Sequence, residues 1–425
     1  MKNITLSGLT IIAIFSASLV MAFSCSNNES PLTFENVWSD PTEQVNGTLE
    51  TINNIEVMKL RGTHYEQGYA YGYLKAPEIL HIINGLIQTE FKGMSAAVWE
   101  NNFMESLENI NIEDRFLNEF QGMLDGINAR AENDAVIPVL ERKLKLEDIL
   151  IINCFHEVLA FNCSSFAAWG NMTEDGDPII VKNNDWFFTS FSLVDMQFLC
   201  VRKQPSQSGL LSTISMTIPG IITMGAGINS DGIIAFFLDA QGLEPTQVTN
   251  ITPRLIQGWD ALEKTDLDGV IMKYGNILKS HKILVGGITM LGFPGESNTF
   301  EACVFEHDGN YSVTDGVTTR YPVDLESYIA CTNDFRERKS PVECWRYNLM
   351  KHELDSINNS NGTEYLTVGR AWDMLSEVPI EGDLLYYTMV CEPAKGLMHL
   401  AVSRNWQHAP ECEKSTFVIN DLFDY

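Results

Sequence analysis

The chain has 425 residues, and 45% of them are hydrophobic, which is enough to fill a sizeable core in one large domain or two ordinary ones. Its 28 Lys and Arg residues against 56 Asp and Glu residues give a formal net charge of −28, with no basic stripe along the chain. This charge disfavours nucleic acid, anionic membranes and polyanionic substrates as partners. The composition therefore indicates a globular protein without a nucleic-acid partner.

Residues 1–25 are predicted to form a signal peptide. A weakly basic start is followed by an apolar run from Ile4 to Phe23 and by small residues, the pattern of an export signal that is later removed. The small residues before Cys25 also resemble a bacterial lipoprotein signal, in which Cys25 would carry a lipid anchor and be the only membrane attachment. Residues 26–47 are polar and are expected to form a linker.

The expected location is secreted, lysosomal or periplasmic, with a cell-surface lipoprotein as an alternative. Asn-x-Ser/Thr triplets fit a glycoprotein of a eukaryotic secretory or lysosomal compartment, although a sequence rich in Asn also produces them by chance. Nine cysteines show neither a dense disulfide framework nor a Cys-x-x-Cys metal site, so no metal or other cofactor is expected. The triplets include those that begin at Asn28, Asn46, Asn171, Asn250, Asn310, Asn358 and Asn361, and Asn162-Cys163-Ser164 at the expected cleavage site is one as well.

Residues 48–162 are expected to form a mainly helical N-terminal segment. A short strand from Ile55 to Leu60, with alternating apolar and charged residues, comes first. The helix after it contains Gly68 and Gly72, whose i, i+4 spacing would give it a smooth face for close packing. Helical periodicity then predicts helices near residues 77–90, 103–131 and 146–160.

Two short strands joined by an acidic, glycine-containing turn follow directly. The first strand starts at Cys163, and the second runs from Ile179 to about Asp185. Because the far ends of an antiparallel hairpin are neighbours, the Asp185 carboxylate is expected beside the Cys163 thiol. The alternative is that Cys163 is a buried and inert cysteine, as most free cysteines are.

The rest of the chain alternates groups of strands with groups of helices. This order fits a sandwich of sheets flanked by helices better than a βαβ order, so we predict one compact α+β domain in which residues 163–425 continue the N-terminal segment. Strands are expected over residues 196–201, 211–217, 221–226, 233–238, 282–284, 301–305, 327–332, 384–391 and 397–403, and helices over 253–263, 267–278, 341–357 and 366–375.

A cysteine nucleophile at position 163 needs a base, and no local Cys/His signature supplies one. Cleavage of the bond between Asn162 and Cys163 would create an α-amino group with an ordinary pKa of about 7.7–8.0 on the same residue as a thiol of about 8.5. That amine can act as the base for its own nucleophile. One residue would then supply both functions.

The region around Cys163 resembles N-terminal-nucleophile hydrolases of the cysteine type, namely the penicillin acyltransferase family of self-processing peptidases and, more distantly, the choloylglycine hydrolases. This resemblance implies a four-layer αββα sandwich of two antiparallel sheets flanked by helices. It also implies self-cleavage between Asn162 and Cys163 into an α chain (48–162) and a β chain (163–425) that remain associated. The matching motifs are Cys163-Ser164-Ser165-Phe166, Asp175-Gly176 and Asn183-Asn184-Asp185-Trp186.

The same resemblance assigns roles to residues further along the chain. Asn333 matches the Asn whose side chain serves the oxyanion hole, and Arg346 matches the expected partner of the active-site carboxylate Asp185. Asp239 lies at a substrate-side position that is usually Asn, and as an acid it would favour a substrate bearing an amine. On residue type alone, Asn333 fits a turn at a strand end equally well, and Arg346 fits a helix surface.

Asn183 and Trp186, which flank Asp185 on the second strand, are further candidates for substrate contacts. Two departures from the family pattern also stand out. Lys182 replaces an Arg of the bile-salt enzymes, and Asp334 replaces a His that often follows the oxyanion Asn.

The expected function is that of an exported, self-processing hydrolase or acyltransferase. It would cleave a linear amide, a non-peptide C–N bond, in a small-molecule amide or N-acyl substrate through an S-acyl intermediate on Cys163. One alternative is a lysosomal lipid amidase or phospholipase-B-like hydrolase on the same fold. The other is an uncut, non-enzymatic binding protein, which the departures at Lys182, Asp239 and Asp334 favour.

Overall fold

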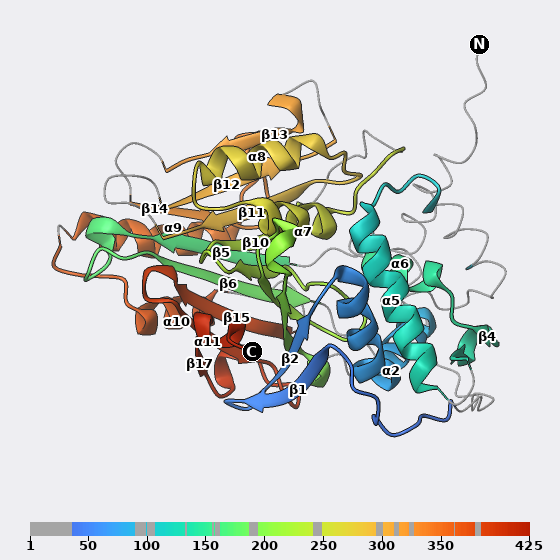
Figure 1. Cartoon of the computed structure of the whole chain (residues 1–425). Coiled ribbons are helices and arrows are strands. Elements are labelled where there is room, and N and C mark those ends of the chain that lie inside the picture. Colours follow the sequence, from blue (N-terminus) through green and yellow to red (C-terminus); the bar gives the residue numbers. More distant parts are fainter. Residues whose placement is uncertain are drawn as a thin grey trace, which may run out of the picture.

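The computed structural model describes most of the chain from residue 36 onward (Figure 1). The predicted signal peptide, the anchor position Cys25 and the first part of the linker lie outside the described residues. The described ranges are 36–89, 99, 107–131, 134–154, 157, 162–186, 194–240, 249–294, 301–309, 314–322, 327–360, 362–378 and 384–425.

The larger sheet has nine strands in the order β1-β2-β7-β8-β9-β10-β11-β12-β13. Neighbouring strands are antiparallel except β2 and β7, which are parallel. This pair departs from the predicted antiparallel sheet because a long crossover separates the two strands in the chain. The strands are β1 (Gly47–Ile52), β2 (Ile55–Arg61), β7 (Phe198–Lys203), β8 (Thr213–Thr217), β9 (Ala226–Asn229), β10 (Ile234–Asp239), β11 (Gly287–Gly292), β12 (Ala302–His307) and β13 (Val317–Arg320).

The smaller sheet has six antiparallel strands in the order β14-β5-β6-β15-β16-β17. The predicted hairpin forms its β5 and β6 strands, which run through the middle of the molecule (Figure 1). The strands are β5 (Asn162–Ala168), β6 (Ile179–Trp186), β14 (Tyr328–Cys331), β15 (Leu384–Glu392), β16 (Leu397–Val402) and β17 (Ser415–Val418).

The predicted four-layer αββα arrangement is confirmed. The two sheets contact each other through β5 with β10 and β11, and through β14 with β12. Helices α7 (Arg254–Lys264) and α8 (Val270–Ser280) contact the larger sheet, and α9 (Trp345–Asn359) and α10 (Val368–Glu377) contact the smaller one. Each of these helices lies within a few residues of its prediction.

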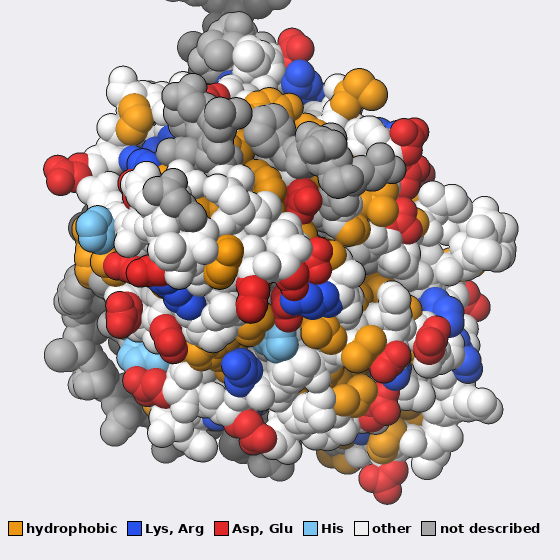
Figure 2. All heavy atoms as spheres, turned by 90° about the vertical axis from the view of Figure 1, so that its left-hand side faces the viewer, with side chains coloured by type: hydrophobic (Ala, Val, Ile, Leu, Met, Phe, Trp, Pro, Cys, Tyr) orange, Lys and Arg blue, Asp and Glu red, His pale blue; other side chains and the backbone are white. Residues whose placement is uncertain are grey.

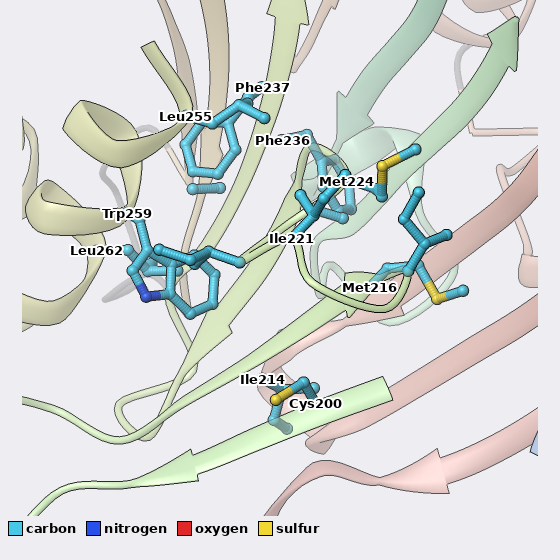
Figure 3. Packing of buried hydrophobic residues seen from close by; sticks show 14 of the residues in the cluster. Cys200, Ile214, Met216, Ile221, Met224, Phe236, Phe237, Leu255, Trp259 and Leu262 are labelled. Carbon is cyan, nitrogen blue, oxygen red and sulfur yellow. The ribbon is translucent and has the colours of Figure 1, made fainter. Parts of the chain in front are cut away.

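Glycine allows α7 to pack closely on the larger sheet. A Cβ at Gly227 of β9 would come closer than 3.0 Å to both Trp259 and Leu262 of α7. Figure 3 shows this part of the core, in which the two α7 side chains lie beside the strands that carry Ile214 and Phe236. The same apolar cluster includes residues from both sides of the Asn162–Cys163 bond.

Helices α2 (His64–Thr89), α5 (Asp114–Arg130) and α6 (Leu146–Cys154) gather at one end of the molecule (Figure 1). As predicted, Gly68 and Gly72 give α2 a close-packing face. A Cβ at either position would come closer than 3.0 Å to the backbone of α5, and Gly122 and Gly126 of α5 are restricted in the same way by α2. The two helix backbones are therefore in direct contact.

Two of the predicted strands are wrong. Residues 221–225 form a tight connection rather than a strand, because Gly220 and Gly225 take φ values of +87° and +90°, which break an extended run. The strand predicted at 282–284 lies further along, as β11 at Gly287–Gly292. In contrast, Gly232 takes the positive φ predicted for the turn before β10, at +81°.

The surface agrees with the acidic composition. On the face shown in Figure 2, single basic side chains lie among acidic ones without merging into a basic patch. Within the described residues, no helix combines the length and the apolar character needed to cross a membrane.

Candidate active site

The β5–β6 hairpin brings together the residues predicted at its far ends. Cys163 lies directly opposite Asn184, and Asn162 lies directly opposite Asp185. Residues that face each other across an antiparallel pair project from the same side of the sheet. The candidate nucleophile therefore shares its face with Asn184. Asp185 shares the opposite face with Asn162, and not the face of the Cys163 thiol as expected from the ends of the hairpin.

The Cys163 thiol is fully buried. The Asn184 side chain donates to Sγ through Nδ2 at 3.6 Å, and Lys182 acts on the thiol as a nearby cation. Burial raises the pKa of Cys163 to about 12, although the Lys182 charge opposes this rise. In the uncut chain Cys163 is therefore a protonated thiol at neutral pH.

Lys182 lies deep in the sheet sandwich beside this thiol. Its Nζ donates to the carbonyl oxygens of Gly225 at 2.7 Å and Phe237 at 2.6 Å, and it hydrogen-bonds with Cys163 as well. These acceptors match the three donors of an ammonium group. Burial lowers the pKa of Lys182, while the Cys163 and Asp239 charges raise it.

Asn333 and Arg346 hold the backbone of the nucleophile. Asn333 Oδ1 accepts a hydrogen bond from the Cys163 amide N–H at 2.8 Å and another from Arg346 at 3.1 Å. A second guanidinium nitrogen of Arg346 donates to the Cys163 carbonyl at 2.8 Å and lies 3.9 Å from an Asp185 oxygen. Four of the predicted residues, Cys163, Asp185, Asn333 and Arg346, therefore meet in one buried cluster.

Asp239 reaches this cluster through its backbone rather than its carboxylate. Its carbonyl accepts a hydrogen bond from Asn333 Nδ2 at 2.6 Å. The carboxylate lies 3.0 Å from Arg254, whose Nε lies 3.2 Å from Glu157. Since Arg254 already neutralises Asp239, the structure does not support the expectation that this acid selects a substrate bearing an amine.

Asn183 is not brought to the thiol. It lies opposite Ser164, on the other face of the sheet, where it donates to the Leu375 carbonyl at 2.7 Å and accepts from Thr388 at 2.7 Å. These bonds tie β6 to α10 and β15. Trp186 ends β6, and its side chain lies outside the part of the chain that the structure describes.

Sequence reasoning missed Asn184, Arg254 and Glu157. The two-residue period of a strand could have identified Asn184, because the residue that faces Cys163 must alternate with Asn183. The contact between Arg254 and Glu157 had no local signal, since it joins distant parts of the chain.

Other clusters lie apart from these residues. One cluster with the spacing of metal ligands consists of Glu113, Asp260 and His281. Arg115 and Lys264 already form ion pairs with its two carboxylates, which leaves little negative charge to bind a metal ion. A cavity of about 470 Å³ beside His64 contains none of the predicted site residues.

No family model and no curated protein matches the chain. Among solved structures, a Caenorhabditis elegans ortholog of N-acylethanolamine-hydrolyzing acid amidase matches at 10% identity and a TM-score of 0.38, over 60% of this chain and 99% of that one. A conjugated bile acid hydrolase from Clostridium perfringens matches at 11% identity and a TM-score of 0.37, over 61% and 94%. Penicillin V acylase from Agrobacterium tumefaciens matches at 11% identity and a TM-score of 0.33, over 57% and 83%. By name, these neighbours are an amidase, a hydrolase and an acylase.

Proposed function

We propose that the chain is an exported, self-processing amide hydrolase whose nucleophile is Cys163. The observation that carries this proposal is the hydrogen bond from the Cys163 amide nitrogen to Asn333 Oδ1. This nitrogen would become the α-amine after cleavage, and it already has a buried acceptor. Asn333 is itself held by Arg346, so the acceptor has a defined orientation.

Self-cleavage would begin with attack of Cys163 Sγ on the carbonyl carbon of Asn162. The S–C bond forms as the C–N bond to Cys163 breaks, and the thiol proton passes to the Cys163 nitrogen, which becomes the free amine. Water then adds to the thioester, releases the Asn162 carboxyl group and restores the thiol. The two fragments would stay associated through their shared core.

In the mature enzyme, the α-amine of Cys163 would take the thiol proton as the sulfur attacks a substrate amide. The proton then passes to the leaving amine, and the acyl group remains on the sulfur until water releases it. Lys182 would stabilise the sulfur while it carries negative charge, because a neighbouring cation favours the thiolate. Transfer of the acyl group to an amine instead of water would make the same site an acyltransferase.

One observation favours the alternative of an uncut binding protein. The Cys163 thiol is completely buried, and its pKa is raised to about 12, as expected of an inert cysteine. In such a protein, the contacts of Asn333 and Arg346 would only stabilise the sheet.

An acyl-trapping experiment tests the proposed function. Purified protein is incubated with a panel of N-acyl anilides, quenched in acid and analysed by intact mass. We expect an acyl adduct on the fragment that starts at Cys163 and its loss on treatment with hydroxylamine. The Cys163→Ala variant should give no adduct, whereas Cys331→Ala, which removes another buried thiol, should still give one. An adduct on any other residue, or no turnover of any amide, would contradict the proposal.

A further inference from the structure

A built anion site lies at the start of α7, and a carboxylate of the chain itself occupies it. Glu157 Oε1 accepts hydrogen bonds from the Arg254 backbone N–H at 2.8 Å and from the Arg254 Nε at 3.2 Å. Arg254 is the first residue of α7 and is 5% exposed. A helix N-terminus and a guanidinium group that act on the same oxygen are a strong arrangement for binding an anion.

This anion site is connected to the nucleophile by three consecutive contacts. Arg254 lies 3.0 Å from the Asp239 carboxylate. The Asp239 carbonyl accepts from Asn333 at 2.6 Å, and Asn333 in turn accepts from the Cys163 amide at 2.8 Å. The Asp239 charge also acts on the Cys163 thiol. Arg254 therefore belongs to the surroundings of the proposed reaction.

Glu157 lies on the acyl side of the bond that self-cleavage would break. It precedes Asn162, so it belongs to the group that would be transferred to the sulfur of Cys163 and then released. A small substrate that acylates the same sulfur must place its own acyl group on the side of Cys163 that Asn162 and the residues before it take in the uncut chain. The position of the Glu157 carboxylate therefore indicates where a charged group on that acyl chain would lie.

The charges around the site no longer balance when Glu157 leaves. Among the described residues, the uncut site balances three cations against three anions, and without Glu157 one cation is in excess. The Glu157 carboxylate also lacks part of its hydrogen bonding, because its Oε2 has no hydrogen-bond partner among the described residues. Burial raises the pKa of this carboxyl group. The charged residues of the site are Lys182, Arg254, Arg346, Glu157, Asp185 and Asp239.

We propose that Glu157 in the uncut chain occupies the place of an anionic group on the acyl half of the substrate, and that Arg254 and the first turn of α7 bind that group after self-cleavage. The substrate class is then an amide whose acyl chain carries a terminal carboxylate. This inference rests on the proposed function and adds no reactant to it, since water still releases the acyl group.

Two anilides of equal chain length test this specificity. N-glutaryl-p-nitroanilide carries the terminal carboxylate, whereas N-pentanoyl-p-nitroanilide lacks it. We expect kcat/KM to favour the glutaryl substrate by about tenfold or more, the size of effect that one charged hydrogen bond gives. The Arg254→Met variant should bring this ratio close to one, and Arg254→Lys should restore part of it. Arg142→Met is the matched control, because Arg142 pairs with Asp148 and should leave the ratio unchanged.

A binding measurement keeps the inference testable if Arg254→Met does not fold. Glutarate is titrated calorimetrically into the uncut Cys163→Ala protein and into the Cys163→Ala/Glu157→Ala protein. We expect binding only to the second, in which the anion site has been vacated, and no binding of pentanoate to either. Failure of the second protein to bind glutarate, or equal binding of glutarate and pentanoate, would overturn the inference.

The outcomes separate this inference from the proposed function. If the chain neither cleaves itself nor hydrolyses any amide, both fail together. If it does both but prefers the pentanoyl substrate, only the inference fails. A preference for N-pentanoyl-4-aminobenzoate, which carries its carboxylate on the leaving amine, would also overturn it, because the anion would then lie on the other half of the substrate.

Discussion

Asn333 Oδ1 accepts a hydrogen bond from the Cys163 nitrogen, which self-cleavage would release as an amine. It accepts another from the guanidinium group of Arg346, which orients the Asn333 side chain. Replacing Asn333 by Ala removes that acceptor, so we expect the rate of self-cleavage to fall by about 100-fold or more, as when other active-site hydrogen-bond partners are lost. The measurement is the fraction of cut chain over time on a denaturing gel. Asn348→Ala, an exposed change on α9, is the control. Cleavage of Asn333→Ala at the wild-type rate would show that this hydrogen bond is only structural.

Lys182 should set the acidity of the nucleophile. Because a neighbouring cation lowers the pKa of a thiol, Lys182→Met should move the pH profile of Cys163 alkylation in the mature protein upward by about one unit or more. Lys182→Arg should stay close to wild type, since it keeps the charge. Iodoacetamide labelling followed by mass spectrometry gives the profile, with the partly exposed Lys351→Met as control. If the pH midpoint of Cys163 labelling is unchanged in Lys182→Met, Lys182 does not control the pKa of the thiol.

At the scale of elements, the contact between α2 and α5 depends on glycine. In the Gly72→Ala variant, the new Cβ would meet the Met123 backbone of α5, so we expect the free energy of unfolding to fall by about 1–3 kcal/mol. Gly369→Ala in α10 is the matched control, because nothing lies closer than 3.8 Å to its Cβ position, and Ala should stabilise that helix slightly. Urea unfolding measures both. Equal stability of the two variants would contradict the close packing.

The elements that sequence analysis predicted well are those with a local signal. The β5–β6 hairpin has β-branched residues and an Asp-Gly turn, and α7 to α10 have a clear helical period, so short-range rules were sufficient. The connection at 221–225 was mistaken for a strand because its apolar residues are buried without being extended. The parallel pair of β2 and β7 could not be predicted, since the two strands are far apart in the chain.

The same distinction applies to the site. Family motifs indicated Asn333 and Arg346, and the structure brings both to Cys163. The motif alone does not distinguish Asn183 from Asn184, whereas strand alternation places Asn184 opposite Cys163. The pairing of Asp239 with Arg254 depends on how β10 meets α7, which no local pattern reveals. The expected preference for an amine therefore has no support from the structure.

At the scale of the whole molecule, a buried ionic cluster joins the N-terminal segment to the rest of the chain. We define this cluster as His64, Glu119 and Arg115 on one side and Arg202 and Glu263 on the other. His64 Nδ1 lies 2.7 Å from Glu119, whose other oxygen accepts from Arg202 at 2.9 Å, and Arg115 pairs with Glu263. The cluster would hold the two fragments together after cleavage.

The titration of this cluster predicts greatest stability at mildly acidic pH. Burial and the Arg115 charge lower the pKa of His64, but the hydrogen bond to Glu119 and the charges of Glu119 and Glu263 outweigh them and raise it above 6.5. Protonated His64 therefore contributes its full stabilisation of the fold below pH 6.5, and this stabilisation is lost as the pH rises through the raised pKa. Burial raises the pKa of Glu263, which acts in the same direction. Burial raises the pKa of Glu119, but Arg202 and His64 outweigh burial and lower it to about 2. The Glu119 carboxylate therefore contributes its full stabilisation of the fold above pH 4.5, and this stabilisation is lost as the pH falls from 4.5 towards 2.

We therefore expect the free energy of unfolding to be higher at about pH 5.5 than at about pH 8, with His64 contributing a slope of up to about 1.4 kcal/mol per pH unit. Urea unfolding across this range measures the slope. His64→Gln should flatten it, whereas the exposed His352→Gln on α9 should not. If wild type and His64→Gln share the same pH dependence, the cluster does not control stability in the way described.

The most direct test of self-cleavage at Cys163 is the intact mass and N-terminal sequence of the purified protein beside its Cys163→Ala variant. Self-cleavage at Cys163 gives two fragments for wild type, one of which begins Cys-Ser-Ser-Phe, and a single chain across that junction for the variant. A wild-type chain that stays uncut from mildly acidic to neutral pH would contradict the proposed mechanism, because the α-amine on which its chemistry depends would never form.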